Sequence, residues 1–344
     1  MHEGNGSATF NVDYSISLDT QALSYLEPYI YETSKKIPAD FAEVFEFLSR
    51  EDVNVDPMPY LHENLLKHNY FTDFDKIFCR YKCYEILRTL DLEHLRVNKQ
   101  IRSKLSDEQL NIKTQQNLAT IIHGINDNVR QDLTFRVDCY YCIIMQMAII
   151  HFTRPQLTLA QKMDKILNFM DEELTTIFMR ELIIAYEFFK QGTKLTFFGK
   201  IQNNNLNILR DIRNMTWDFF HIRQLEETLT INFNKEARYY FPSLLTFDKR
   251  FNQIIEICPL KACAYFDGIH QPIPFYDNNA MNAINNFVNS SYEIKERYFS
   301  NNAKLSRNHR RKNIKNNIKN LVLACEIELS QFCISSKDAL LSQN

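Results

Sequence analysis

Glycine is scarce in this chain of 344 residues, which contains only 6 of them. The phosphate-binding loops of common nucleotide-binding folds need glycines at fixed spacing, and the sequence has neither G-x-G-x-x-G nor G-x-x-x-x-G-K-[ST]. Nucleotide binding through loops of those types is therefore not expected. Scarce glycine also favours long helices, because glycine destabilises the interior of a helix.

An excess of charge of either sign is also missing, since 40 basic and 42 acidic residues give a formal net charge of −2. The protein as a whole lacks a basic field for nucleic acid, so any basic surface must be local. The first residues lack a signal-peptide pattern, and no run shows the length and apolarity expected of a membrane span. These observations predict a cytosolic protein without a membrane partner.

Cysteine is present, but not in a pattern typical of zinc. In the cytosol the 8 cysteines are expected to stay reduced. Cys139 and Cys142 have C-x-x-C spacing, but they lie in the apolar run of residues 136–150, which is typical of a buried helix. No paired set of Cys or His has zinc-finger spacing, so a structural zinc site is not expected.

Strand patterns occur at the start of the chain and again after residue 172, with a helical region between them. Residues 10–19 alternate between apolar and polar, which predicts a strand with one polar face. Thr20 is expected to cap the helix that follows. Apolar residues at helical spacing occupy residues 51–171. Beyond residue 172 the patterns predict helices at 174–189 and 206–229, and strands at 194–201, 239–247 and 262–266.

Three aspartates occur where a strand or turn meets a helix. Asp19 closes the first alternating run, Asp218 lies within residues 213–221, and Asp248 closes the predicted strand at 239–247. Open α/β sheets place their chemistry at the carboxyl ends of strands. If the three carboxylates meet, their repulsion is costly without a cation, so they predict a divalent metal site.

The segment Ile16-Ser-Leu-Asp19-Thr20 and the helix after it resemble the opening of a PIN-like nuclease domain. The stretch Phe178-Met-Arg-Glu181 resembles the helix that carries the family's glutamate, and Asp218 resembles its helix-borne third acid. Leu244-Leu-Thr-Phe-Asp248 resembles the late strand with its Thr-x-Asp motif. The four acids follow the family's order along the chain.

The resemblance implies a helix-dominated α/β fold, in which a small parallel PIN-like sheet is flanked by helices and interrupted by an all-helical insertion. The expected organisation is a flexible tail at 1–8, a discontinuous PIN-like domain at 9–50 and 172–270, a helical insertion at 51–171, and a basic helical extension at 285–344.

The chemistry that the resemblance implies is metal-assisted hydrolysis of phosphodiester bonds in RNA, with a toxin or defence nuclease as one context. The expected ligands of Mg²⁺ or Mn²⁺ are Asp19, Glu181, Asp218 and Asp248. The cations expected to hold phosphate are Arg213, Arg223, Lys249 and Arg250. Hard divalent ions prefer such oxygen ligands.

Each acid also has a plainer interpretation. Asp19 and Asp248 are good helix N-caps, because a carboxylate there accepts from free backbone N–H groups. Glu181 is a candidate for a surface ion pair, and Glu43, Glu46 or Glu187 are alternatives for the second acid. Asp218 is harder to explain in this way, because it lies in mid-helix between two aromatic residues, where a lone buried carboxylate is disfavoured.

Two other functions fit parts of the sequence. Arg213-Asn214 followed by His221 resembles the R-N-x(4–6)-H pattern of HEPN-like ribonucleases, which are helical and metal-independent. The spacing of Arg213 and His221 puts them about two turns apart on roughly one face of a helix. Alternatively, the chain is a non-enzymatic interaction or regulatory protein that contacts a protein partner through its helical insertion.

A basic stretch near the end of the chain has two interpretations. It is either a solvated helix face or a local contact for nucleic acid, because clustered Lys and Arg neutralise phosphates. Its members are Lys304, Arg307, His309, Arg310, Arg311, Lys312, Lys315 and Lys319.

Overall fold

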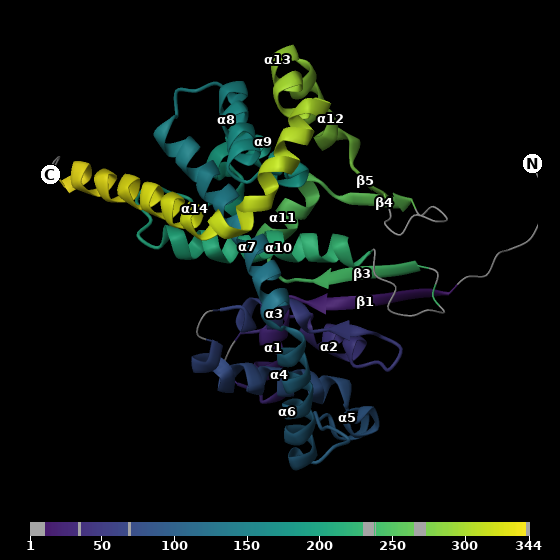
Figure 1. Ribbon diagram of the computed structural model, residues 1–344. Helices are drawn as coiled ribbons and strands as arrows, with labels where there is room; N and C mark the ends of the chain where they lie inside the picture. Colours follow the sequence, from purple (N-terminus) through teal and green to yellow (C-terminus); the bar gives the residue numbers. More distant parts are fainter. Residues whose placement is uncertain are drawn as a thin grey trace, which may run out of the picture. The chain divides into compact units, whose positions relative to one another are not determined.

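A computed structural model describes residues 11–33, 36–67, 70–229, 237, 239–264 and 273–341 (Figure 1). The predicted tail at 1–8 lies outside them. The chain divides into two compact units. The first unit contains Met1–Arg130, Arg223–Asp248 and Gly268–Pro272, and the second contains Gln131–Ile222, Lys249–Asp267 and Ile273–Asn344. The predicted insertion at 51–171 therefore contributes to both units.

The first unit is built around a three-stranded parallel sheet of order β2-β1-β3, in which β1 and β3 lie side by side (Figure 1). The strands are β1 (Val12–Leu18), β2 (Val55–Asp56) and β3 (Tyr239–Leu245). β1 and β3 pair in parallel over seven residue pairs, from Val12 with Tyr239 to Leu18 with Leu245. The prediction of a helix-dominated fold with a small parallel sheet is confirmed.

Helices of the first unit pack on this sheet and on one another. They are α1 (Thr20–Ile30), α2 (Phe41–Leu48), α3 (Met58–Leu65), α4 (Phe74–Arg88), α5 (Leu92–Asn98) and α6 (Asp107–Gly124), with the 3-10 turn η1 (Tyr70–Asp73). Helices α1 and α3 contact β1, α4 packs on α1, and α6 packs on α4. The core contains Leu18 and Val55 from the sheet together with Leu23 and Phe45 from the helices. Burial of such side chains stabilises each by about 1.5–3 kcal/mol relative to exposure.

The second unit is largely helical. Its helices are α8 (Leu159–Glu172), α9 (Met179–Gln191), α11 (Lys249–Ile257), α12 (Asn278–Asn289), α13 (Tyr292–Ile294) and α14 (Asn301–Leu341), with η2 (Gly192–Lys194), η3 (Thr196–Phe198) and the π-helical η4 (Lys295–Phe299). Two strands, β4 (Leu260–Ala264) and β5 (Ile273–Tyr276), form an antiparallel pair. Two helices begin in one unit and end in the other, namely α7 (Asp127–Thr153) and α10 (Ile208–Thr228).

Helix α7 corrects one expectation from the sequence. Its length of 27 residues and its mean hydropathy meet the criteria for a membrane span, whereas no such run was expected. However, 78% of its most apolar window is buried inside the protein. Cys139 and Cys142 lie in this buried part as free thiols, as predicted. Burial of this kind is typical of the core helix of a soluble protein.

Three further expectations are wrong in detail. Residues 194–201 form no strand but contain the short helix η3, where Phe197 N donates to Gln253 Oε1 at 3.2 Å. The insertion is not all-helical, because β2 lies within it. Asp19, not Thr20, caps α1: Asp19 Oδ1 accepts from the backbone N–H of Ala22. Thr20 is the first residue of the helix.

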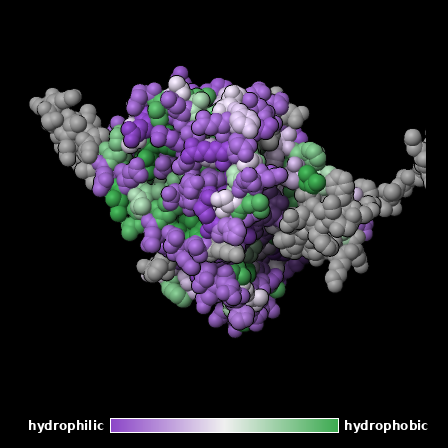
Figure 2. Space-filling model, turned by 45° about the horizontal axis from the view of Figure 1, so that its top comes forward, coloured by the Kyte–Doolittle hydropathy of each residue, from purple (hydrophilic) through white to green (hydrophobic). Residues whose placement is uncertain are grey.

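The described surface carries both hydrophilic and apolar residues. Over the face in Figure 2 hydrophilic residues predominate, with apolar patches among them. Exposed large apolar side chains come from separate elements, for example Phe71 from η1 and Tyr292 from α13. Scattered apolar residues of this kind are ordinary on a soluble protein.

Candidate carboxylate site at the sheet edge

The carboxyl ends of the three parallel strands bring several polar side chains to one edge of the sheet. Leu18 pairs with Leu245, so the next residues, Asp19 and Thr246, lie beside each other. The backbone N–H of Asp19 donates to the carbonyl oxygen of Leu245 at 3.2 Å. The last residue of β2, Asp56, pairs with Ser17. Strand ends at one edge of a parallel sheet are the usual place for chemistry in α/β folds.

Asp19 is a buried carboxylate with a full set of hydrogen bonds. Its side chain is 8% exposed, and it accepts from the backbone N–H of Ala22 at 2.5 Å and from the hydroxyl of Thr246. Burial raises the pKa of Asp19, the bonds from Ala22 and Thr246 lower it, and the negative charge of Glu63 raises it. Because burial dominates, the ionised form of Asp19 is disfavoured in the fold.

Asp56 and Glu63 join Asp19 at this edge and were not predicted from the sequence. Ser17 Oγ donates to Asp56 Oδ2 at 2.8 Å, and the backbone N–H of Met58 donates to Asp56 Oδ1 at 2.9 Å. Burial also raises the pKa of Asp56. Glu63, from α3, accepts from the hydroxyl of Thr20. We call Asp19, Asp56 and Glu63 the sheet-edge carboxylates.

The strand pattern explains why these groups share a face. Successive side chains of a strand alternate, so Ser15, Ser17 and Asp19 point to one side of β1. Ser15 and Ser17 are each 3% exposed, and their hydroxyls are satisfied by Tyr240 and Asp56. The polar face predicted for this strand is therefore buried and hydrogen-bonded from Ser15 to Asp19, which allows this part of β1 to occupy the middle of the sheet.

No cation neutralises the sheet-edge carboxylates among the residues that the structure describes. The partners of Asp19, Asp56 and Glu63 there are hydroxyl and backbone N–H groups. In the same part of the chain, no three His, Cys, Asp or Glu side chains are grouped so as to hold a metal ion. The site thus offers hard oxygen donors but not a closed cage. Mg²⁺ is commonly held by one or two carboxylates together with waters and substrate phosphates, so the donor chemistry fits this ion.

The four predicted acids are divided between the two units. Asp19 and Asp248 belong to the first unit, where the N–H of Asp248 donates to Thr246 Oγ1 at 3.1 Å, directly before α11. Glu181 and Asp218 belong to the second unit. Glu181 is 1% exposed in the first turn of α9, and Asp218 is half-buried in α10. That all four converge stays a prediction.

The alternatives for the second acid lie on two helices. Glu43 and Glu46 are on α2, where they line a shallow depression with Arg50. Glu187 is on α9, where its Oε2 accepts from Gln191 Nε2 at 2.7 Å. Glu43 and Glu46 belong to the first unit, together with Asp56 and Glu63, whereas Glu187 belongs to the second unit.

The predicted phosphate-binding cations differ in their surroundings. Arg213 lies over the ring of Tyr141 at 3.5 Å from the centroid and pairs with Asp138 Oδ1 at 3.2 Å and Glu326 Oε1 at 3.4 Å. Arg213 is therefore held in a network inside the second unit.

The other three cations include one in a local ion pair and two at the surface. Arg223 pairs with Glu226 at 2.8 Å in the last turns of α10. Lys249 and Arg250 are exposed at the start of α11.

The surroundings of Arg213 and His221 favour structural roles over HEPN-like catalysis. His221 is 3% exposed and lies against the rings of Trp217 and Phe220, at 6.1 and 5.9 Å between centroids. Arg213 faces two carboxylates and a tyrosine ring. A metal-independent ribonuclease needs its Arg and His on the scissile phosphate, whereas these contacts engage both side chains within the protein.

Four of the eight residues of the basic stretch on α14 form ion pairs. Arg307 and Arg310 pair with Asp171 at 2.5 and 2.7 Å, Lys315 with Asp132 at 2.9 Å, and Lys319 with Asp138 at 2.6 Å. These carboxylates belong to α7 and α8, so the stretch attaches α14 to its neighbours within the second unit. This arrangement favours a structural role over a nucleic-acid contact.

Comparison of the chain with protein-family models, curated proteins and solved structures finds no match. The sheet-edge carboxylates are therefore interpreted from their own geometry and chemistry.

Proposed function

We propose that the protein is a metal-dependent ribonuclease of the PIN-like class, which hydrolyses phosphodiester bonds at the carboxyl edge of its parallel sheet. The observation that supports this most strongly is the grouping of Asp19, Asp56 and Glu63 at that edge, with hydroxyl and N–H partners but no cation from the described residues. Like charges at one site raise the cost of ionisation, which a bound divalent cation would offset.

The pairing of the first and late strands supports the same proposal. The motif that ends in Asp19 and the motif Thr246-Phe247-Asp248 are separated by more than 200 residues, yet β1 and β3 are direct neighbours. Two of the four motifs that carry the PIN-like resemblance are thus adjacent, and the hydroxyl of Thr246 bonds to the carboxylate of Asp19. A chance resemblance at two distant positions would not require this contact.

The residues of the site have separate roles in the proposal. Asp19 and Asp56 hold Mg²⁺ or Mn²⁺, with Glu63 and Asp248 as further oxygen donors. The bound cation supplies activation of a water molecule and neutralises charge on the phosphate. Thr246 orients the carboxylate of Asp19. Lys249 and Arg250 directly follow Asp248 in the sequence and are exposed, and that they contact the phosphates of the strand stays an expectation.

The test is cleavage of a labelled single-stranded RNA, with single-stranded DNA of the same sequence as a second substrate. We expect Mn²⁺ or Mg²⁺ to be required and a chelator to stop the reaction. Asp19→Asn and Asp56→Asn should each reduce the rate by about 100-fold or more, because each removes a charged ligand, whereas asparagine keeps the hydrogen-bond acceptor.

Asp13→Asn is the matched control, because Asp13 lies on the same face of β1 at the opposite end of the strand. It should leave the rate unchanged. Cleavage that persists in chelator and is lost in His221→Ala would replace the proposal with the HEPN-like alternative. Absence of cleavage of both substrates under all conditions would favour the non-enzymatic interaction protein.

A further inference from the structure

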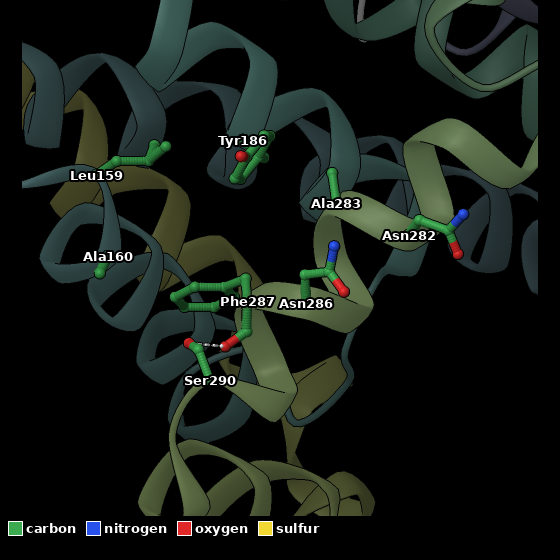
Figure 3. Close-up of a pocket in the computed structure, with 8 residues that line it drawn as sticks. All are labelled: Leu159, Ala160, Tyr186, Asn282, Ala283, Asn286, Phe287 and Ser290. Carbon is green, nitrogen blue, oxygen red and sulfur yellow. Dashed lines mark hydrogen bonds between the residues drawn. The ribbon is translucent and has the colours of Figure 1, made fainter.

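A groove of about 590 Å³ lies in the second unit between α8, α9 and α12 (Figure 3). Leu159 and Ala160 come from the start of α8, Tyr186 from α9, and the remaining lining residues from α12 and the residue that follows it. Its volume is within the range of pockets that bind small ligands, which is roughly 300–1,000 Å³. None of the functions considered above uses this groove.

The lining of the groove is uncharged and partly aromatic. The ring of Tyr186 comes from one wall and the ring of Phe287 from another (Figure 3). No Asp, Glu, Lys or Arg is among the lining residues. A lining of this kind disfavours a ligand whose charged group enters the groove and favours a flat, uncharged ring system.

Polar groups lie in a row along one side of the groove. Asn282, Asn286 and Ser290 are four residues apart, so they follow one face of α12 and its end. Within the described chain the amides of Asn282 and Asn286 have no hydrogen-bond partner, whereas the hydroxyl of Ser290 donates to the carbonyl oxygen of Phe287 at 2.6 Å. An amide offers one donor and one acceptor side by side, which matches the edge of a nucleobase.

A positive charge lies beside the same wall. The ammonium group of Lys190 is 5.9 Å from the centroid of the Tyr186 ring, and its side chain is more than half exposed. Its ion pair with Glu187 is long, at 3.9 Å. A ligand that combines an uncharged planar ring with an anionic group at its other end fits this arrangement.

We propose that this groove binds a nucleobase, which packs against Tyr186 and Phe287, bonds to the amide of Asn286 and places its phosphate near Lys190. Stacking on aromatic side chains together with amide contacts to the base edge is a general mode of base recognition and needs no glycine-rich loop. The base belongs either to a free nucleotide or to a single-stranded nucleic acid. The proposal is independent of the sheet-edge carboxylates.

Binding is measured with AMP and with a short oligoadenylate, both fluorescently labelled, in chelator so that no metal-dependent cleavage occurs. Tyr186→Ala and Asn286→Ala should each weaken binding about tenfold, because each removes one of the two kinds of base contact. Asn285→Ala is the matched control, since Asn285 is exposed on α12 outside the lining and should bind as the wild type does.

The two probes distinguish the sources of the base. Saturable binding of AMP with loss in Asn286→Ala assigns the groove to a free nucleotide. Binding of the oligoadenylate alone, with the same loss, assigns it to a strand. The proposal is overturned if neither probe binds, if ribose 5-phosphate competes as well as AMP does, or if Asn285→Ala weakens binding as much as Asn286→Ala. Far-UV circular dichroism confirms that each variant is folded.

Discussion

Replacement of Asp19 by asparagine and by alanine separates the two roles of this side chain. Asparagine keeps an oxygen that accepts from the backbone N–H of Ala22 and from the hydroxyl of Thr246, but it has no charge. Alanine has neither the charge nor an oxygen that can accept these two hydrogen bonds. Because burial raises the pKa of Asp19, the ionised carboxylate is unfavourable to the fold at neutral pH when no cation is bound.

The expected magnitudes follow from these contacts. Loss of an N-cap costs about 1 kcal/mol, and loss of a partner for the Thr246 hydroxyl costs about 1 kcal/mol more. In chelator at pH 7, Asp19→Ala should therefore be about 2 kcal/mol less stable than Asp19→Asn. Asp19→Asn should be at least as stable as the wild type.

Urea unfolding followed by far-UV circular dichroism measures both differences. The pKa of Asp19 in the folded protein lies above the ordinary pKa of an aspartate. The contribution of protonated Asp19 to stability is therefore fully present when the pH is below that ordinary pKa. The contribution is lost as the pH rises through the folded pKa, and the wild type should therefore gain stability relative to Asp19→Asn as the pH falls from 7 towards 4. If Asp19→Asn is as unstable as Asp19→Ala in chelator, the charge itself stabilises the fold and the reasoning is wrong.

Three further predictions concern other parts of the protein. Arg307→Ala should lower the free energy of unfolding of the second unit by about 3–5 kcal/mol, because it breaks a buried ion pair. Lys304→Ala, on the exposed face of α14, should lower it by less than about 0.5 kcal/mol, with unfolding followed by the fluorescence of the single tryptophan. With a thiol reagent, exposed Cys79 should react in the native protein, while Cys139, whose pKa burial raises to about 12, should react only in denaturant. Burial lowers the pKa of His62 to about 4, so the contribution of neutral His62 to stability is present above its ordinary pKa of 6.5 and lost as the pH falls through about 4. His62→Gln should therefore weaken the dependence of the melting temperature on pH between these two values.

The long elements of the fold were predictable from the sequence because their side-chain periods extend over many residues. The alternation of residues 10–19 predicted β1, and the residues around Asp248 predicted β3. Helical spacing predicted most of α7 and α10. The periodicity of apolar side chains is informative only over several residues, so long elements are the easiest to predict from the sequence.

Short elements and contacts distant in sequence were not predictable. β2 contains two residues, which is too few for any period, so Asp56 was not recognised as a strand-end acid. Glu63 was missed because its place at the site depends on the packing of α3 beside β1 and on its bond with Thr20. Buried Leu195 and Phe197 are two residues apart as in a strand, but Phe197 belongs to the 3-10 helix η3 and Leu195 directly precedes it.

The ion-pair partners of the basic residues were not predictable for the same reason. Arg213 looked available for phosphate in the sequence, because nothing local indicates that Asp138 and Glu326 face it. These partners are 75 and 113 residues away along the chain. The basic stretch on α14 likewise finds its carboxylates on α7 and α8.

Titration of the protein with Mn²⁺ tests the central claim most directly, since it measures occupation of the sheet edge without reference to a substrate. The account predicts that Mn²⁺ binds to the wild type saturably. Binding is measured as the decrease of the free Mn²⁺ signal in electron paramagnetic resonance. Asp19→Asn and Asp56→Asn should weaken this binding at least tenfold, a rough expectation for the loss of one charged ligand, while Asp13→Asn binds as the wild type does. Equal Mn²⁺ binding by the wild type, Asp19→Asn and Asp56→Asn would contradict the account.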